Sequence, residues 1–220
     1  MVVAAGPGLG RSVALRFGRE GADVALVARS ADRLEPLADE VRALGVRALA
    51  VSADVADASS LRQGLAAVRR TLGDPTVAVY NGSEYVEGTP TTVAYDAFVH
   101  CLLVGIGGAL VTVQAVVPAM RAAGRGTVLL TGSEAALRPY AGAAAVGVAK
   151  AGLRSLALSA AAELTSSGVQ VATVTVRGRL KAGTRFDPDL VADHYWALHR
   201  RRREEWEPEL VLTKDTPPPG

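Results

Sequence analysis

The chain contains very little cysteine and very little lysine. Cys101 is the only cysteine among 220 residues. No disulfide can therefore form within the chain, and a disulfide-stapled scaffold is excluded. Only three of the 24 basic residues are lysines, an imbalance that we interpret as compositional bias without functional meaning.

The sequence also lacks an excess of either charge. The 24 basic and 22 acidic residues leave a net charge of +2, whereas nucleic-acid binding needs a basic excess gathered on one face. We therefore expect a small-molecule substrate and no nucleic-acid partner. A length of 220 residues with 49% hydrophobic residues is enough for one full-sized domain to bury a core.

No export signal is recognisable at the start of the sequence. Met1 to Ala5 has no positively charged region and too few apolar residues for a signal peptide, so we expect a cytoplasmic protein. Residues 97–120 carry no formal charge and are long enough to span a bilayer. They include His100, Gln114 and Pro118 and lie among segments typical of a soluble domain. We therefore predict a helix covered by protein and no membrane partner.

Short β-branched runs alternate with longer segments of helical spacing. The runs are residues 24–27, 46–51, 77–80, 127–131 and 169–176, and the helical segments are 11–20, 31–44, 58–72, part of 92–123, and 141–166. Such repeats predict parallel strands joined by right-handed helical crossovers. The expected fold is α/β, a single-domain, three-layer, Rossmann-like doubly wound sheet. Gly21, Gly45, Gly73, Gly124 and Gly168 are expected to end the helices.

The strand-helix pattern changes after residue 176. Residues 187–203 have helical spacing and end in four arginines, followed by Glu204 and Glu205. The adjacent glutamates favour a solvated helix end over a phosphate-binding patch. Residues 209–213 are expected to form a last strand. We therefore predict a nucleotide-binding domain over residues 1–186, with a C-terminal helix and tail, residues 187–220, packed on it.

The first strand, predicted over residues 2–5, runs directly into a glycine-rich turn. Gly6, Gly8 and Gly10, together with Leu9, precede a predicted helix. Glycines here let the backbone approach a pyrophosphate, and the helix N-terminus supplies free N–H donors. The spacing is G-x-G-x-G, because Arg11 follows Gly10, and it departs from the longer dinucleotide fingerprint.

Further candidate cofactor-binding residues follow the next three strands. Arg29 stands where NAD-specific sheets usually carry an acidic residue for the ribose 2′-hydroxyl. A guanidinium suits a 2′-phosphate instead, so we predict NADP (NADPH) in preference to NAD. Asp54 and Val55 follow the third strand, and Asn81-Gly82 follows the fourth. A solvated surface charge is the alternative interpretation of Arg29.

Together these features resemble the short-chain dehydrogenase/reductase family over nearly the whole chain up to Gly178. The family's Thr-Gly-x-x-x-Gly-x-Gly motif is matched by residues 3–10, with Ala4 in place of the first glycine. Asp54-Val55 matches its Asp-Val, and residues 80–83 match its Asn-Asn-Ala-Gly loosely. The family's Pro-Gly after the sixth strand is Arg177-Gly178, which makes Gly178 a further cofactor-binding candidate.

The resemblance also assigns catalytic positions, and here the sequence departs from the family. Ser133 matches the serine that binds the substrate oxygen, and Lys150 matches the lysine of Tyr-x-x-x-Lys, which holds the nicotinamide ribose. The tyrosine position, four residues earlier on the same helix face, is Val146. The expected asparagine of the preceding helix is Gly105. The usual proton donor and its relay are therefore missing.

Other residues are candidates for the missing proton donor. Tyr140 and Tyr85 stand in loops after strands, and Glu84 and Glu134 would serve if burial raised their pKa values. We interpret His100, on an apolar helix, as a core histidine.

Three functions remain open at this point. The first is NADPH-dependent reduction of a small carbonyl, imine or enone with a non-standard proton donor. The second is a non-redox reaction such as proton transfer, cyclisation or elimination. The third is a catalytically silent partner of an active homologue. In each case the resemblance implies a homodimer or homotetramer formed through the two long helices after the fourth and fifth strands.

Overall fold

The computed structural model describes residues 1–219 and contains one seven-stranded sheet. All neighbouring strands run parallel, in the order β3-β2-β1-β4-β5-β6-β7. The strands are β1 (Val2–Val3), β2 (Val24–Ala28), β3 (Ala48–Ser52), β4 (Val77–Tyr80), β5 (Gly126–Ser133), β6 (Val169–Val176) and β7 (Glu209–Leu212). The predicted fold class is confirmed.

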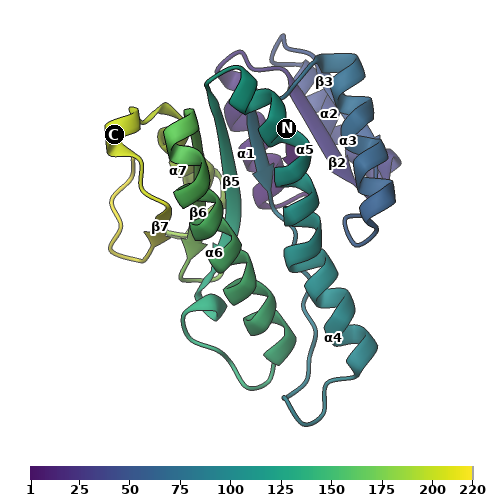
Figure 1. Ribbon diagram of the computed structural model, residues 1–220, viewed down its shortest axis with the longest axis vertical. Helices are drawn as coiled ribbons and strands as arrows, with labels where there is room; N and C mark the ends of the chain where they lie inside the picture. Colours follow the sequence, from purple (N-terminus) through teal and green to yellow (C-terminus); the bar gives the residue numbers. More distant parts are fainter. Residues whose placement is uncertain (220) are drawn as a thin grey trace.

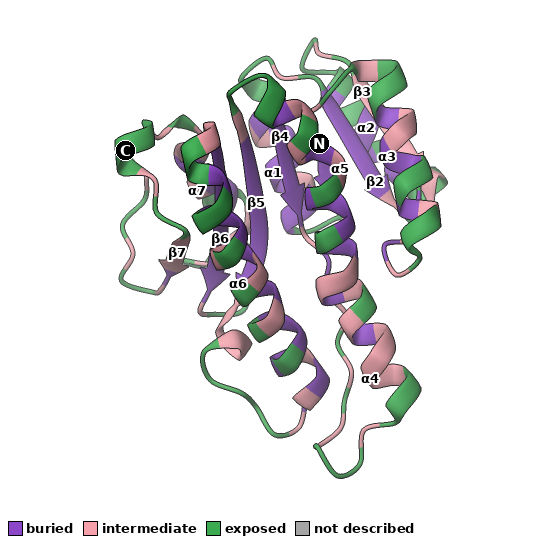
Figure 2. Cartoon of the chain, viewed as in Figure 1, coloured by how far each residue is buried: buried purple, intermediate pink, exposed green. Residues whose placement is uncertain are grey.

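Helices cover both faces of this sheet (Figure 1). The helices are α1 (Leu9–Arg19), α2 (Ala31–Arg42), α3 (Ala58–Leu72), α4 (Tyr95–Leu102), α5 (Gly108–Ala122), α6 (Ala144–Leu164) and α7 (Pro188–Arg200). Helices α1, α2 and α7 share one apolar core with the sheet, whereas α3, α5 and α6 share the other. The strands are apolar on both faces, so each face of the sheet needs a covering layer of helices, which gives three layers. Figure 2 shows the sheet buried between helices whose outer faces are exposed.

The five glycines expected to end helices lie in the left-handed region of the backbone. Their φ values are +85° for Gly21, +86° for Gly45, +88° for Gly73, +64° for Gly124 and +77° for Gly168. Each helix stops there because other residues rarely adopt this conformation. Elsewhere the predicted boundaries differ by a few residues: β3 begins at residue 48, α6 at 144 and α7 at 188.

The long helix expected within residues 92–123 is interrupted. A π-helical turn, η1 (Leu103–Gly107), separates α4 from α5. The buried Tyr80 hydroxyl donates a hydrogen bond to the Val104 carbonyl in this turn. Burial raises the pKa of the Tyr80 phenol, so it stays protonated as a donor. Single π turns of this kind are frequent at functional sites.

Two helical stretches are long and apolar enough to cross a membrane, Tyr95–Ala122 and Ala144–Ser167. In both, 44% of the most apolar window is buried within the protein. Val113 and Val116 of the first stretch, and Leu153 and Ala157 of the second, belong to the core shared by α3, α5 and α6. These contacts are those expected of core helices.

The C-terminal segment belongs to the same sheet and core. Val191 and Tyr195 of α7 pack with Val13 of α1, and β7 pairs with β6 at the edge of the sheet. Asp187 caps α7 by accepting a hydrogen bond from the Asp189 backbone N–H. The division at residue 186 stays a prediction, and Gly220 lies outside the described residues.

Candidate dinucleotide cleft and active site

Two adjoining clefts lie along the carboxyl ends of the strands. Their volumes are about 210 and 400 Å³, and they share Ala4, Asn81 and Ser83. Ala4 follows β1 and Asn81 follows β4, so the clefts meet where the strand order reverses. This switch point is the usual ligand site of an open α/β sheet. The larger cleft adds Gly6, Gly8, Leu9, Gly10, Thr131, Gly132, Ser133, Lys150, Val176, Gly178 and Leu180.

The N-terminus of α1 opens into the larger cleft. Gly8 is its N-cap and supplies no side-chain hydrogen bond, and the first turn contains no acidic residue. By contrast, Asp57 caps α3 with its carboxylate. The Arg11 and Ser12 N–H groups donate to the Gly6 and Gly8 carbonyls, which leaves the N–H groups of Leu9 and Gly10 available to an anion.

The glycines of the turn leave space for that anion. A Cβ on Gly6 or Gly8 would meet nothing within 4 Å, whereas a Cβ on Gly10 would lie 3.1 Å from the Ala5 Cα. Gly10 therefore allows the helix to pack closely on the strand, and the other two leave an open cradle. This geometry fits a pyrophosphate.

Ala4 occupies the position of the first glycine in the family motif. It is the one non-glycine residue with positive φ in the described chain, at +56°. An L-residue in this region costs roughly 1–2 kcal/mol. Ala4 lines both clefts, so the strained residue lies at the centre of the site, where the chain must turn from β1 toward Gly6.

The smaller cleft brings together the other predicted cofactor residues. Arg29, Asp54 and Val55 line it with Asn81 and Val104. The Arg29 side chain is exposed, and its guanidinium has no carboxylate partner among residues 1–219. The Asp54 carboxylate accepts a hydrogen bond of 2.9 Å from the Ala56 N–H and fixes the turn after β3. Arg29 is therefore free to bind an anion at this end.

Lys150 lies on α6 at the floor of the larger cleft and is only 4% exposed. Its ammonium donates hydrogen bonds to the carbonyl oxygens of Thr131, at 2.8 Å, and Gly82, at 3.2 Å. No carboxylate in the described chain pairs with it. Burial lowers the pKa of Lys150 to about 8, so the group titrates close to neutral pH.

Ser133 ends β5 and lines the same cleft as Lys150. Its Oγ accepts a hydrogen bond of 3.2 Å from the Ala135 N–H. The hydroxyl proton has no acceptor within the described residues, and it can be donated to a substrate oxygen.

An apolar side chain occupies the position of the family tyrosine, and close packing leaves no room at the position of the family asparagine. Val146 is half-buried and packs against the cluster of Cys101, Ala145 and Ala149. Gly105 lies in η1, and a Cβ built on it would lie 2.7 Å from the Ala149 Cβ. The two helices are therefore too close for a larger residue at position 105. Neither a phenol nor a relay amide is present.

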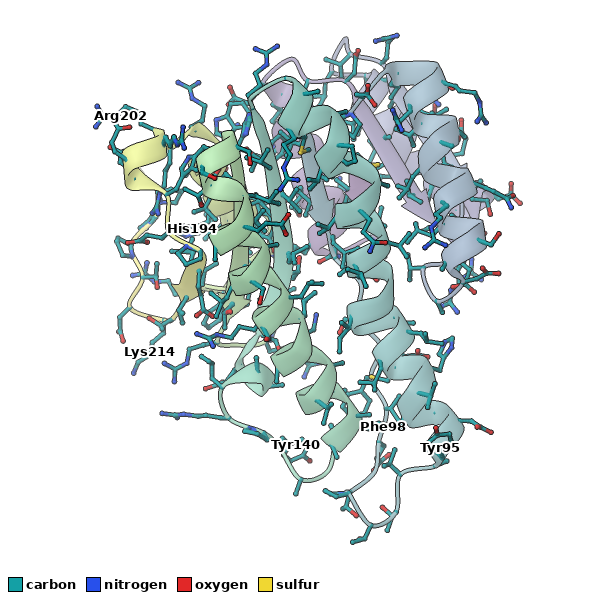
Figure 3. The ribbon with its side chains drawn as sticks, viewed as in Figure 1. Tyr95, Phe98, Tyr140, His194, Arg202 and Lys214 are labelled. Carbon is teal, nitrogen blue, oxygen red and sulfur yellow. The ribbon has the colours of Figure 1, made fainter. Side chains whose placement is uncertain are left out.

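The tyrosine candidates for a replacement donor lie outside the cleft. Tyr140 is 63% exposed and Tyr85 is 70% exposed, and neither lines either cleft. Figure 3 shows Tyr140 at the outer end of α6, away from the sheet. A catalytic role of Tyr140 stays a prediction that would require this loop to move.

Both glutamates lie beside basic side chains. Glu134 Oε1 lies 3.4 Å from Arg177 Nη2, and Glu84, which lines the smaller cleft, has Oε2 at 3.1 Å from His100 Nε2. The interpretation of His100 as a core histidine is wrong, because its side chain is 42% exposed. The loop between β4 and α4 brings Glu84 beside His100. The helical periodicity of the sequence cannot indicate a contact made by a loop.

Several residues of the site were not predicted. Ser83, Val104 and Leu180 line the clefts, and the Thr131 carbonyl holds the lysine. Thr131 immediately precedes Gly132-Ser133. Its place near the carboxyl end of a predicted strand was the signal that could have identified it as a site residue. Val104 had no signal, because its place depends on the π turn.

The sequence pattern of the family described as short chain dehydrogenase matches residues 1–181. The chain therefore belongs to this family of oxidoreductases, which use nicotinamide cofactors. One curated relative is the (2S)-[(R)-hydroxy(phenyl)methyl]succinyl-CoA dehydrogenase subunit BbsC of Thauera aromatica, 32% identical, covering 80% of this chain and 70% of that protein. Another is a 3-oxoacyl-[acyl-carrier-protein] reductase of Staphylococcus epidermidis, 29% identical, covering 79% and 72%.

Solved structures agree with this assignment. A short-chain dehydrogenase from Rhodopseudomonas palustris is 28% identical, with a TM-score of 0.88, and covers 96% of both chains. A metagenomic short-chain oxidoreductase in complex with NADP is 29% identical, with a TM-score of 0.87, and covers 96% of this chain and 95% of its own. The predicted family resemblance is confirmed.

Proposed function

We propose that this protein is an NADP(H)-dependent oxidoreductase that acts on a small carbonyl, imine or enone with a non-standard proton donor. The observation that carries the proposal is the pairing of an open dinucleotide cradle with Val146 at the tyrosine position. The uncapped N-terminus of α1 would hold the pyrophosphate, and Arg29 would bind the 2′-phosphate. When bound there, the cofactor supplies the hydride.

Ser133 and Lys150 would do the remaining chemistry. The Ser133 hydroxyl donates a hydrogen bond that holds the substrate oxygen, and Lys150 donates the proton that this oxygen receives. Lys150 is suited to this role because it lines the cleft and its pKa is lowered to about 8, and a catalytic acid works best with a pKa near the working pH. After each turnover the neutral amine regains a proton from solvent.

Replacing Lys150 by Arg tests this assignment. Arginine keeps a positive charge but does not give up its proton, so we expect turnover to fall by about 10²-fold. In the unchanged protein, turnover at saturating NADPH should fall as the pH rises through about 8, because only the ammonium donates. Turnover that stays level from pH 6 to pH 10 would exclude Lys150 as the donor, whether or not the variant folds.

Replacing Arg29 by Asp tests the choice of cofactor. Loss of the guanidinium removes a charge-assisted contact to the 2′-phosphate, and the carboxylate offers an acceptor to the 2′-hydroxyl of NADH. We expect NADPH binding to weaken at least tenfold while NADH binding does not weaken. The two dissociation constants can be measured by the fluorescence of the reduced nicotinamide. Tighter binding of NADH than of NADPH by the unchanged protein would defeat the assignment.

A catalytically silent subunit is the second candidate function. Two observations favour it: the closed packing of Gly105 on Ala149 and a relative that is named as a subunit of a dehydrogenase. Co-purification with an active homologue, together with NADPH binding but no turnover alone, would establish this alternative. It would replace the catalytic proposal for Lys150 without affecting the cofactor assignment.

We also propose that the protein forms a homodimer or homotetramer in the cytoplasm. Three apolar side chains on the long helices are exposed: Leu103 in η1, Leu110 in α5 and Val148 in α6. Burying such apolar side chains in an interface between subunits favours their association. Light scattering that gives the mass of one chain would contradict this proposal.

A further inference from the structure

The π turn η1 contributes to the wall of the smaller cleft. Val104 of this turn lines that cleft, and the next residue, Gly105, packs closely on Ala149 of α6. The turn therefore lies between the cleft and the helix that carries Lys150. Its exact conformation determines where this wall of the cleft lies.

The backbone hydrogen bonds of η1 leave one carbonyl for an outside donor. The Gly108 N–H donates to the Leu103 carbonyl, whereas an α-helix would direct it to the Val104 carbonyl. The Val104 carbonyl instead accepts a hydrogen bond from the Tyr80 hydroxyl. A side chain of the sheet thus replaces a backbone donor of the helix, and this bond stabilises the π form of the turn.

Packing holds the Tyr80 phenol in this position. Its exposed fraction is 0%. A Cβ on either Gly82 or Gly108 would collide with the phenol, and a Cβ on Gly108 would also lie 2.7 Å from the Val55 carbonyl oxygen. The two glycines leave room for the phenol beside η1, so the hydroxyl is directed at the turn before any ligand binds.

The smaller cleft is lined mainly by small apolar residues. With a volume of about 210 Å³, it is lined by Ala4, Ala5, Ala28, Ala53, Val55 and Val104, and by Arg29 among its polar residues. Apolar linings with a few placed polar groups are typical of sites for flat organic ligands. A cofactor whose 2′-phosphate is bound by Arg29 would therefore place its base in this cleft, within reach of Val104.

We propose that Tyr80 is a positioning residue for the adenosine half of the cofactor, because it holds η1 in the form that places Val104 against the base. This inference rests on the proposed function and adds to it a residue that lines neither cleft. Tyr80 acts on the cofactor only through the turn. Without its hydroxyl the Val104 carbonyl loses its donor from the sheet, and Val104 is free to shift away from the base.

Tyr80→Phe tests the proposal, because it removes the hydroxyl and keeps the ring. We expect the dissociation constants of NADPH and of adenosine 2′,5′-bisphosphate to rise about two- to tenfold, as for the loss of one hydrogen bond. The fluorescence of bound NADPH measures the first constant, and displacement of NADPH measures the second.

Tyr195→Phe is the matched control. Tyr195 is equally buried, and its hydroxyl makes a hydrogen bond of 2.8 Å with the Thr131 hydroxyl. Thr131 does not line the smaller cleft. The control variant loses a comparable buried hydrogen bond and should keep the affinity for adenosine 2′,5′-bisphosphate unchanged.

Val104→Ala is a second test that does not depend on the folding of Tyr80→Phe. Val104 is half-buried, and shortening it removes the wall but keeps the carbonyl that Tyr80 binds. The affinity for adenosine 2′,5′-bisphosphate should fall by a similar factor.

Unchanged affinity for adenosine 2′,5′-bisphosphate in Tyr80→Phe or in Val104→Ala would overturn the inference. Equal losses in Tyr80→Phe and Tyr195→Phe would also overturn it, because the effect would then reflect general destabilisation. So would bound NADPH that the bisphosphate does not displace, because the smaller cleft would not hold that half of the cofactor. Failure of NADPH binding in the unchanged protein would instead defeat the proposed function.

Discussion

The Gly8→Asp variant is expected to lose dinucleotide binding while keeping its fold. A side chain at this position meets nothing within 4 Å, so a carboxylate would extend into the open cradle. There it would occupy the anion site at the N-terminus of α1 and repel the pyrophosphate. We expect NADPH to bind at least about 100-fold more weakly, or ~2.7 kcal/mol. The fluorescence of bound NADPH measures this change.

Gly8→Asn is the control for that experiment. Asparagine has nearly the same shape and demands the same backbone conformation, but it carries no charge. It should weaken binding much less than aspartate does, and the two variants should unfold at similar temperatures. Equal loss of NADPH binding in both variants would show that the volume of the added side chain, and not its negative charge at the anion site, weakens binding.

Val146→Tyr is expected to gain ketone reductase activity. Position 146 lies one helical turn before Lys150 on the same face of α6, so a phenol there would lie beside the ammonium. A positioned general acid contributes about 10² to 10⁴-fold to rate, and we expect a gain within this range. The measurement is NADPH oxidation with a panel of ketones.

Val146→Phe is the matched control, because it adds the same ring without the hydroxyl. The phenylalanine variant should stay at the level of the unchanged protein. Equal rates for the two variants would show that the phenol does not act as an acid at this position. A gain with tyrosine alone would show that the other parts of the site are competent.

The alternation of short strands and helices was enough to predict the sheet and most of its boundaries. The reason is local: β-branched runs form buried strands, and a glycine with positive φ ends a helix wherever the chain must turn. Gly45 and Gly168, for example, lie within a few residues of the strands that follow them. The cradle was predictable for the same reason, because Gly6, Gly8 and Gly10 act through their own backbone.

The features that escaped prediction depend on contacts between distant segments. The π turn forms where Tyr80 of β4 meets the Val104 carbonyl, and an apolar helix pattern looks the same with or without such a turn. The pairing of His100 with Glu84 depends on how a loop folds back. The lowered pKa of Lys150 results from burial of its side chain. The neighbouring residues in the sequence do not indicate how deeply this side chain is buried.

The contact between Gly105 and Ala149 constrains how the usual active site could be restored. An asparagine introduced at position 105 would collide with the Ala149 Cβ, because even a Cβ there lies at 2.7 Å. Removal of that methyl group by Ala149→Gly would relieve the collision. The two substitutions are therefore strongly non-additive. An evolutionary or laboratory path back to the standard site is open in one order only, with the glycine on α6 coming first.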